Sequence, residues 1–118
     1  MSFSLAGFLK KKRSIIITQW VDQLKIQVSP QYADRPRKEL VSTVSQAYDA
    51  NAHVLLYNDF SYIDRFIEKI SQMRLKAGFP LSDVQMAFEL YRSVVFPLIA
   101  AETTVEEFFA TITQINRC

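Results

Sequence analysis

Two apolar stripes with the repeat of an α-helix, placed on either side of one short turn, constrain this chain more than any other feature. Three- and four-residue steps of this kind indicate one face of a helix. The first stripe consists of Phe60, Ile63, Phe66, Ile67, Ile70, Met73 and Ala77. The second consists of Leu81, Val84, Phe88, Tyr91, Val95 and Leu98. Because so short a connection makes consecutive helices antiparallel neighbours, we expect the two stripes to pack against each other.

The ends of these two helices are marked by residues with known capping preferences. Asp59 or Ser61 can cap the first helix through a side-chain oxygen, and Ser82 can cap the second in the same way. Gly78 can end the first helix because glycine enters the left-handed conformation at no steric cost. Pro97 is expected to kink the second helix or to end it just before, because proline lacks an amide donor.

The remainder of the chain also predicts helices. Residues 4–28 form one long predicted helix that ends at the Ser29-Pro30 step, and residues 31–36 form a connector. Trp20 lies in the most continuous apolar face of this helix, so we expect it to be buried. The full stripe comprises Ile16, Ile17, Trp20, Val21, Leu24 and Val28.

Two further helices complete the prediction. One covers residues 36–56. Its residues predicted to face the core are Leu40, Val44, Ala47, Tyr48, Val54 and Leu55. The last begins at Thr103 and Thr104, each followed three residues later by a glutamate, which is the pattern of a capping box. It carries Val105, Phe108, Phe109, Ile112 and Ile115. No stretch predicts a strand, so the sequence indicates an all-α fold, an antiparallel bundle of about five helices that forms one domain over residues 1–118.

Bulk properties exclude several classes of protein. A net charge of +2 from nearly balanced acids and bases gives no support for nucleic-acid binding. No apolar run approaches the roughly 20 residues that span a bilayer, and the N-terminus does not resemble a secretory signal. Cys118 is the only cysteine, so an internal disulfide is impossible, and a reduced cytoplasmic setting is the expectation.

No residue pattern predicts catalysis, and we expect no enzymatic activity, no metal and no cofactor. Neither metal-ligand spacing nor a glycine-rich phosphate loop occurs. His53 is the only histidine, and the residues after it do not match a histidine kinase phosphoacceptor box. A polar position on a helix flank is the simplest interpretation of His53, and axial ligation of haem is the alternative.

The two chain ends carry more apolar surface than one small bundle needs, which predicts a homodimer. The candidate interaction surface consists of Phe3, Leu5, Phe8, Leu9, Phe108 and Phe109. The competing interpretation is that both patches fold back onto their own bundle. The basic run 10–13 is interpreted as a solvated helix segment, and Arg74 either holds a carboxylate such as Glu89 or Asp83 or extends to water.

Scattered positions from Trp20 to Leu98 resemble the N-terminal helical domain of RsbRD-type proteins, which are relatives of the RsbT co-antagonists; this domain also precedes some bacterial sensor histidine kinases. The resemblance rests on Trp20, Leu24, Tyr32, Arg35-Pro36, Glu39-Leu40, Phe66, Ile70, Arg74, Gly78-Phe79-Pro80-Leu81-Ser82, Val84 and Leu90-Tyr91-Arg92.

This resemblance implies a non-catalytic signal-input domain that passes a signal to an output domain or to a protein partner. It also implies globin-like packing without haem as a second possible architecture, because related RsbR input domains have that fold. No output domain is present in the 118 residues, so we expect either an excised N-terminal domain or a free-standing subunit. A sensor that binds a small ligand or haem is the alternative function.

Overall fold

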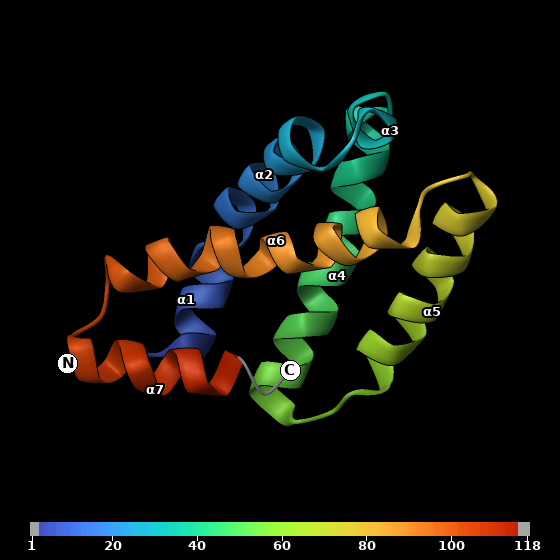
Figure 1. Ribbon diagram of the computed structural model, residues 1–118. Coiled ribbons are helices and arrows are strands. Elements are labelled where there is room, and N and C mark those ends of the chain that lie inside the picture. Colours follow the sequence, from blue (N-terminus) through green and yellow to red (C-terminus); the bar gives the residue numbers. More distant parts are fainter. Residues whose placement is uncertain (1–2, 116–118) are drawn as a thin grey trace.

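The computed structural model describes residues 3–115, and this part of the chain consists of helices joined by short turns, without a strand (Figure 1). This confirms the predicted all-α class. The elements are α1 (Leu5–Lys11), α2 (Arg13–Gln23), the π-helical segment η1 (Leu24–Val28), α3 (Pro30–Ala33), α4 (Arg37–Tyr57), α5 (Ser61–Lys76), α6 (Leu81–Ala100) and α7 (Val105–Ile115). None of the helices in this range combines the length and the apolar character needed to cross a bilayer.

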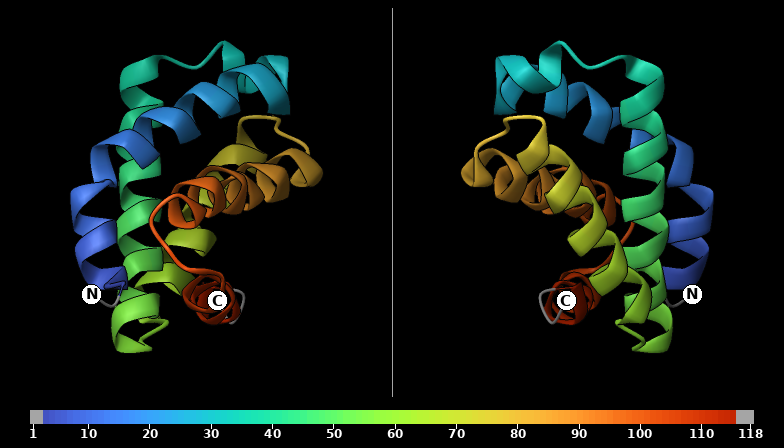
Figure 2. Two further views of the ribbon diagram at one scale, coloured as in Figure 1. Left: turned by 90° about the vertical axis from the view of Figure 1, so that its left-hand side faces the viewer. Right: turned by 90° about the vertical axis from the view of Figure 1, so that its right-hand side faces the viewer.

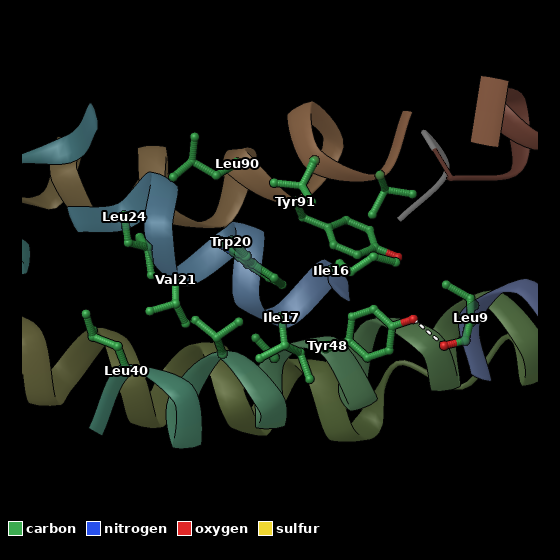
Figure 3. Close-up of a cluster of buried hydrophobic side chains, with 14 of the residues drawn as sticks. Leu9, Ile16, Ile17, Trp20, Val21, Leu24, Leu40, Tyr48, Leu90 and Tyr91 are labelled. Carbon is green, nitrogen blue, oxygen red and sulfur yellow. Dashed lines mark hydrogen bonds between the residues drawn. The ribbon is translucent and has the colours of Figure 1, made fainter. Parts of the chain in front are cut away.

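The core lies around α2, which packs between α4 and α6 (Figure 3). Ile16, Val21 and Trp20 of α2 are almost completely buried, as the apolar stripe predicted. The indole Nε1 of Trp20 donates a hydrogen bond to the Ala87 carbonyl of α6 at 2.9 Å. A helix covered on two sides needs apolar residues over a wide arc, which explains the adjacent pair Ile16 and Ile17, whereas Ile15 is 44% exposed.

The predicted helix over residues 4–28 is interrupted. The chain leaves helical geometry at Lys12, and its last turn, η1, has π-helical hydrogen bonding. The helix ends at Ser29, as predicted, where the backbone becomes extended. The predicted connector after it is wrong in part, because residues 30–33 form α3. Ser29 caps α3 and Pro30 occupies its first position, a combination that the sequence already contained.

The bounds of α4 agree with the prediction to within one residue, and all six residues predicted to face inward are buried. The helix ends at Asn58, whose φ of 54° is left-handed. Phe60 occupies the capping position of α5, so neither Asp59 nor Ser61 is the cap, although Asp59 accepts a hydrogen bond from the Ser61 amide at 3.0 Å.

The expected stripe-against-stripe pairing of α5 and α6 is only partial. Figure 1 shows that α5 and α6 diverge from their connecting turn, and α5 packs mainly against α4. Ile63 and Ile70 of the first stripe are buried, whereas Ile67 is 40% exposed and Met73 is 39% exposed. In α6, Leu81 of the predicted stripe is 54% exposed. The burial of Leu90, Val94 and Ile99 was not predicted; it follows because α6 contacts α2, α5 and α7 and so buries a wider arc.

The sequence predicted structural roles for Gly78 and Ser82 at the α5–α6 turn and for Pro97 in α6, and the structure does not confirm all of them. Gly78 has a φ of +89°, which confirms the left-handed conformation. Ser82 is not the cap of α6, because the helix begins at Leu81 and Pro80 occupies the capping position without a side-chain hydrogen bond. Pro97 does not end the helix, which continues through it to Ala100.

A reciprocal capping box begins α7, as predicted for one of the two threonines. The Thr104 amide donates to Glu107 at 2.9 Å, and the Glu107 amide donates to Thr104 Oγ1 at 3.2 Å. Thr103 instead donates its hydroxyl to the Ile99 carbonyl at 2.8 Å. Figures 1 and 2 both place α7 beside the carboxyl end of α4.

Candidate functional site

A cleft of about 250 Å³ lies between α4, α5, α6 and α7. Apolar side chains from all four helices form most of its lining, which is the composition typical of a small-molecule site. These residues are Val54, Leu55, Phe60, Ile63, Ile67, Phe88, Tyr91 and Ile115. The cleft forms because α5 and α6 diverge from the turn that joins them, so that their apolar stripes separate along their length.

Polar side chains also line the cleft. Asp64 of α5 and Glu89 of α6 are exposed, and Arg92 of α6 is half-buried. The structure assigns Arg92 no hydrogen bond or ion pair with a described residue. Asn51 of α4 completes the polar set, and its amide donates to the Ala47 carbonyl at 2.9 Å. The cleft therefore combines apolar walls with charges of both signs.

Tyr91 connects the cleft to the core. It lines the cleft, and its ring centroid lies 5.4 Å from that of Trp20 and 6.4 Å from that of Tyr48. Tyr48 is itself fixed, because its hydroxyl donates to the Leu9 carbonyl at 2.6 Å (Figure 3). Burial raises the pKa of Tyr48 well above its usual range, so this phenol remains a hydrogen-bond donor at neutral pH.

A second, open groove of about 770 Å³ continues from the cleft along α7. Val54, Leu55 and Phe60 line both spaces. The groove is completed by the end of α4 and by one side of α7, and none of its described lining residues is charged. They are Val54, Leu55, Leu56, Tyr57, Asn58, Phe60, Ala110, Thr113 and Gln114.

One helix, α7, takes part in both spaces and also has a free outer side. Ile115 is buried at the cleft, and the Gln114 amide donates to the Leu55 carbonyl of α4 at 2.9 Å. On its outer side, Val105 is 73% exposed and Phe109 is 64% exposed. Movement of α7 therefore changes the cleft and an exposed apolar surface together.

A buried ion pair lies away from the cleft, where α3, α4, α5 and the α5–α6 turn meet. Arg74 is 1% exposed, and its Nη1 donates to Glu39 Oε1 of α4 at 2.7 Å. The guanidinium also lies 5.4 Å from the Tyr32 ring centroid and 5.3 Å from that of Phe79. Arg74 does hold a carboxylate, but the predicted partners on α6 were wrong, because Arg74 faces α3 and α4.

Many positions that carry the RsbRD resemblance surround this ion pair. A small cavity of about 30 Å³, large enough for one or two water molecules, is lined in part by Trp20, Tyr32, Phe66, Ile70, Arg74 and Val84. The ion pair and the two rings join two segments that are distant in the sequence, residues 32–39 and 74–79, so the main effect of the cluster is to fix how these segments pack. It supports the fold and leaves the cleft as the candidate functional site.

His53 lies outside the cleft, on the flank of α4, as its simplest interpretation predicted. Its Nε2 lies 3.1 Å from Asp59 Oδ2, and its ring packs against Tyr57 and Tyr62. Hydrogen bonds, chiefly from the Ser61 amide and then from His53, hold the pKa of Asp59 below its ordinary value. The hollow that His53 lines also carries Asp49, Arg65 and Lys69, whereas a haem pocket is predominantly apolar, so this arrangement does not favour the haem alternative. The described residues also contain no group of three or more metal-ligating side chains.

The predicted interaction surface divides into buried and exposed members. Phe8 and Leu9 are 3% and 2% exposed and belong to the core, so the competing interpretation holds for them. The prediction failed there because the break at Lys12 turns α1 onto α4. Phe3, Leu5 and Phe108 are partly buried against the core, and Phe109 alone is largely exposed.

The basic run 10–13 is spread around the break between α1 and α2. Arg13 makes a bidentate ion pair with Asp49, at 2.8 and 2.9 Å, and this carboxylate raises the pKa of Arg13. Lys12 lies 3.9 Å from Glu102. Lys10 and Lys11 are exposed. Cys118, the basis of the redox argument, lies outside the described residues.

Comparison with known protein families, with curated protein sequences and with solved structures found no match for this chain. The sequence did not predict the cleft as a site, although five of its apolar lining residues belong to the two stripes.

Proposed function

We propose that this chain is a non-catalytic signal-input and protein-interaction domain. One observation carries the proposal: the inner side of α7 closes an apolar cleft, while its outer side presents Val105 and Phe109 to other molecules. A molecule that occupies the cleft contacts Ile115 and Tyr91 and changes the position of α7. The outer surface of α7 moves with it and transmits the change to a partner.

The RsbRD resemblance supports the biological setting of the proposal. It places the domain in a bacterial signalling protein, either a sensor histidine kinase or an RsbR-like regulator, with a cytoplasmic location and an output domain or separate partner. For the architecture, we propose a five-helix bundle in which α1, α2 and η1 together count as the first helix. Globin-like packing without haem is the alternative.

A small-ligand sensor is the second candidate function, favoured by the size and apolar lining of the cleft. The dye 1-anilinonaphthalene-8-sulfonate, excited directly, is a suitable apolar probe. We expect Ile67→Trp, which fills the cleft from α5, to reduce the dye signal several-fold, and Met86→Trp, on the exposed side of α6, to leave it unchanged. Equal dye signals in both variants would contradict binding in the cleft.

The signal-input proposal is tested by hydrogen exchange along the chain. Ile67 lines the cleft but lies on α5, so filling the cleft at this position should change the exchange of α7 amides through the cleft. We expect Ile67→Trp to alter α7 exchange severalfold and Met86→Trp, also about half exposed, to leave it unchanged. Unchanged α7 exchange in a folded Ile67→Trp variant would overturn the proposal.

A further inference from the structure

The outer side of α7 carries a projecting aromatic ring directly beside a hollow. Phe109 is 64% exposed, and its ring packs edge-on against that of Phe108, with 6.1 Å between centroids. Since Phe108 is itself packed against the core, this contact fixes the direction of the Phe109 ring. Thr113 follows one turn later on the same side of the helix, Ala110 lies on the adjacent side, and both small residues line the open groove.

We propose that two copies of this chain associate about a two-fold axis through α7, with Phe109 of each copy inserted into the groove of the other. The inference deepens the proposed function, since it names the first partner of the α7 surface. In each copy, the ring would lie between α7 and the end of α4. It would contact Ala110 and Thr113 on one side and Leu56, Tyr57 and Phe60 on the other.

The projecting Phe109 ring (the knob) and the groove beside Ala110 (the hollow) together indicate that the partner is a second copy of this chain. In a two-fold contact the same patch faces itself, so one surface must supply both complementary shapes. The α7 surface does so within a single helical turn, through Phe109 and the groove beside Ala110. A partner of another kind would need only one of the two shapes.

The charge distribution supports the same choice of partner. Residues close to a two-fold axis meet their own counterparts, so charges of one sign would repel each other there. None of the described residues that line the groove is charged, and neither Phe109 nor Val105 is; the exposed Glu106, one turn before Phe109 and Ala110, is the charged side chain that lies beside this surface. An aromatic ring held in place before binding also loses little freedom when it is inserted.

The dimer contact shares walls with the cleft. Val54, Leu55 and Phe60 line the groove that receives Phe109 and also the cleft. Occupation of the cleft therefore shifts the side chains against which the partner ring packs. Dimerisation and occupation of the cleft are therefore thermodynamically coupled: occupation of the cleft changes the dimerisation constant by the same factor by which dimerisation changes the affinity of the cleft.

A complementation experiment tests the knob and the hollow separately. Phe109→Ser removes the knob, and Ala110→Trp fills the hollow; both positions are exposed, so folding is preserved in each variant. Ile26→Ser, at a residue that is 78% exposed on η1, is the control for simple loss of surface apolarity. Mass is measured by light scattering at micromolar concentration, and mixed species by native mass spectrometry with one isotope-labelled variant.

We expect the wild type and Ile26→Ser to have twice the 13.6 kDa chain mass and each α7 variant alone to be monomeric. An equimolar mixture of Phe109→Ser and Ala110→Trp should form mixed dimers, because one intact knob meets one open hollow. A monomeric wild type, a dimeric Phe109→Ser variant, or an absence of mixed dimers would each overturn the inference. If the wild type is a monomer but hydrogen exchange in α7 still changes in Ile67→Trp, the dimer inference fails and the proposed function stands. If the wild type is a dimer but α7 exchange does not change in Ile67→Trp, only the proposed function is contradicted.

Discussion

Arg74 shows, at the scale of single residues, how a buried charge depends on one partner. Replacing it with methionine removes its ion pair with Glu39 and its contacts with the Tyr32 and Phe79 rings. We expect the free energy of unfolding to fall by about 3 kcal/mol. This is near the low end of the effect of breaking a buried ion pair, because the Glu39 side chain is 30% exposed and can be solvated. Chemical denaturation measures the loss. The double variant Arg74→Met/Glu39→Met should recover part of it, and a double variant as unstable as the sum of both single ones would argue against a direct pair.

Trp20 is the residue whose environment the sequence predicted best. It is 2% exposed and hydrogen-bonded to Ala87. Trp20→Ala should lower the free energy of unfolding by about 3–5 kcal/mol, because a large cavity remains. Ile26→Ala, at an exposed position, should change it by less than about 0.5 kcal/mol. Equal stabilities of the two variants in urea titrations would contradict the burial.

Periodicity predicted burial for Trp20 but could not predict the partner of Arg74. A stripe reports that a residue faces other chain segments, whereas the identity of those segments depends on how the helices cross. Arg74 and Glu39 are 35 positions apart and are joined only by the packing of α4 against α5. For the same reason, the sequence did not show that Phe8 is covered by its own chain.

At the scale of elements, Gly78 determines the conformation of the turn that connects α5 to α6. Its φ of +89° strains any other residue, although a Cβ there would meet only Gln31 at 3.9 Å. Gly78→Ala should therefore lower stability by about 1–2 kcal/mol, seen as a lower melting temperature. Gly7→Ala, inside α1, should leave the melting temperature unchanged or raise it. A Gly78→Ala melting curve that matches the wild type would exclude the left-handed turn.

The capping box of α7 gives a pH dependence with a defined sign. Hydrogen bonds from the Thr104 amide first, and then from the Phe3 amide, lower the pKa of Glu107 below its ordinary 4.5. A carboxyl with a lowered folded-state pKa stabilises the fold above its unfolded pKa, and this contribution is lost as pH falls through the folded value. The stability difference between wild type and Glu107→Gln should therefore shrink as pH falls below 4.5. A difference that stays constant in denaturation curves from pH 6 to pH 3 would disprove the contribution.

Helix existence, and most helix boundaries, could be predicted because they depend on local signals such as the capping box at Thr104. The exceptions have local causes as well. The Ser29-Pro30 pair was interpreted as a stop, although it also begins α3, and Pro97 is tolerated inside α6. The Phe3 contact to Glu107 joins the two ends of the described chain, and no local pattern encodes it.

The cleft is a property of the whole molecule, and it arises because α6 diverges from α5 and packs against α2. Two apolar stripes that diverge leave part of each uncovered, so Ile67 and Phe60 line a cleft in place of a core. The sequence contained both stripes, but the angle between the helices depends on side-chain packing over the full chain. The apolar residues of the site could therefore be predicted, and the cleft itself could not.

We propose that the cleft and the outer surface of α7 are coupled, and the dimer dissociation constant measures that coupling directly. It can be determined by sedimentation for the wild type, for Ile67→Trp in the cleft and for Met86→Trp outside it. Ile67 does not line the groove that receives Phe109, so a direct effect on the contact is avoided. We predict a shift of about fivefold or more for Ile67→Trp, as expected for coupling of about 1 kcal/mol or more, and no shift for Met86→Trp. Identical dissociation constants for all three proteins would contradict the account.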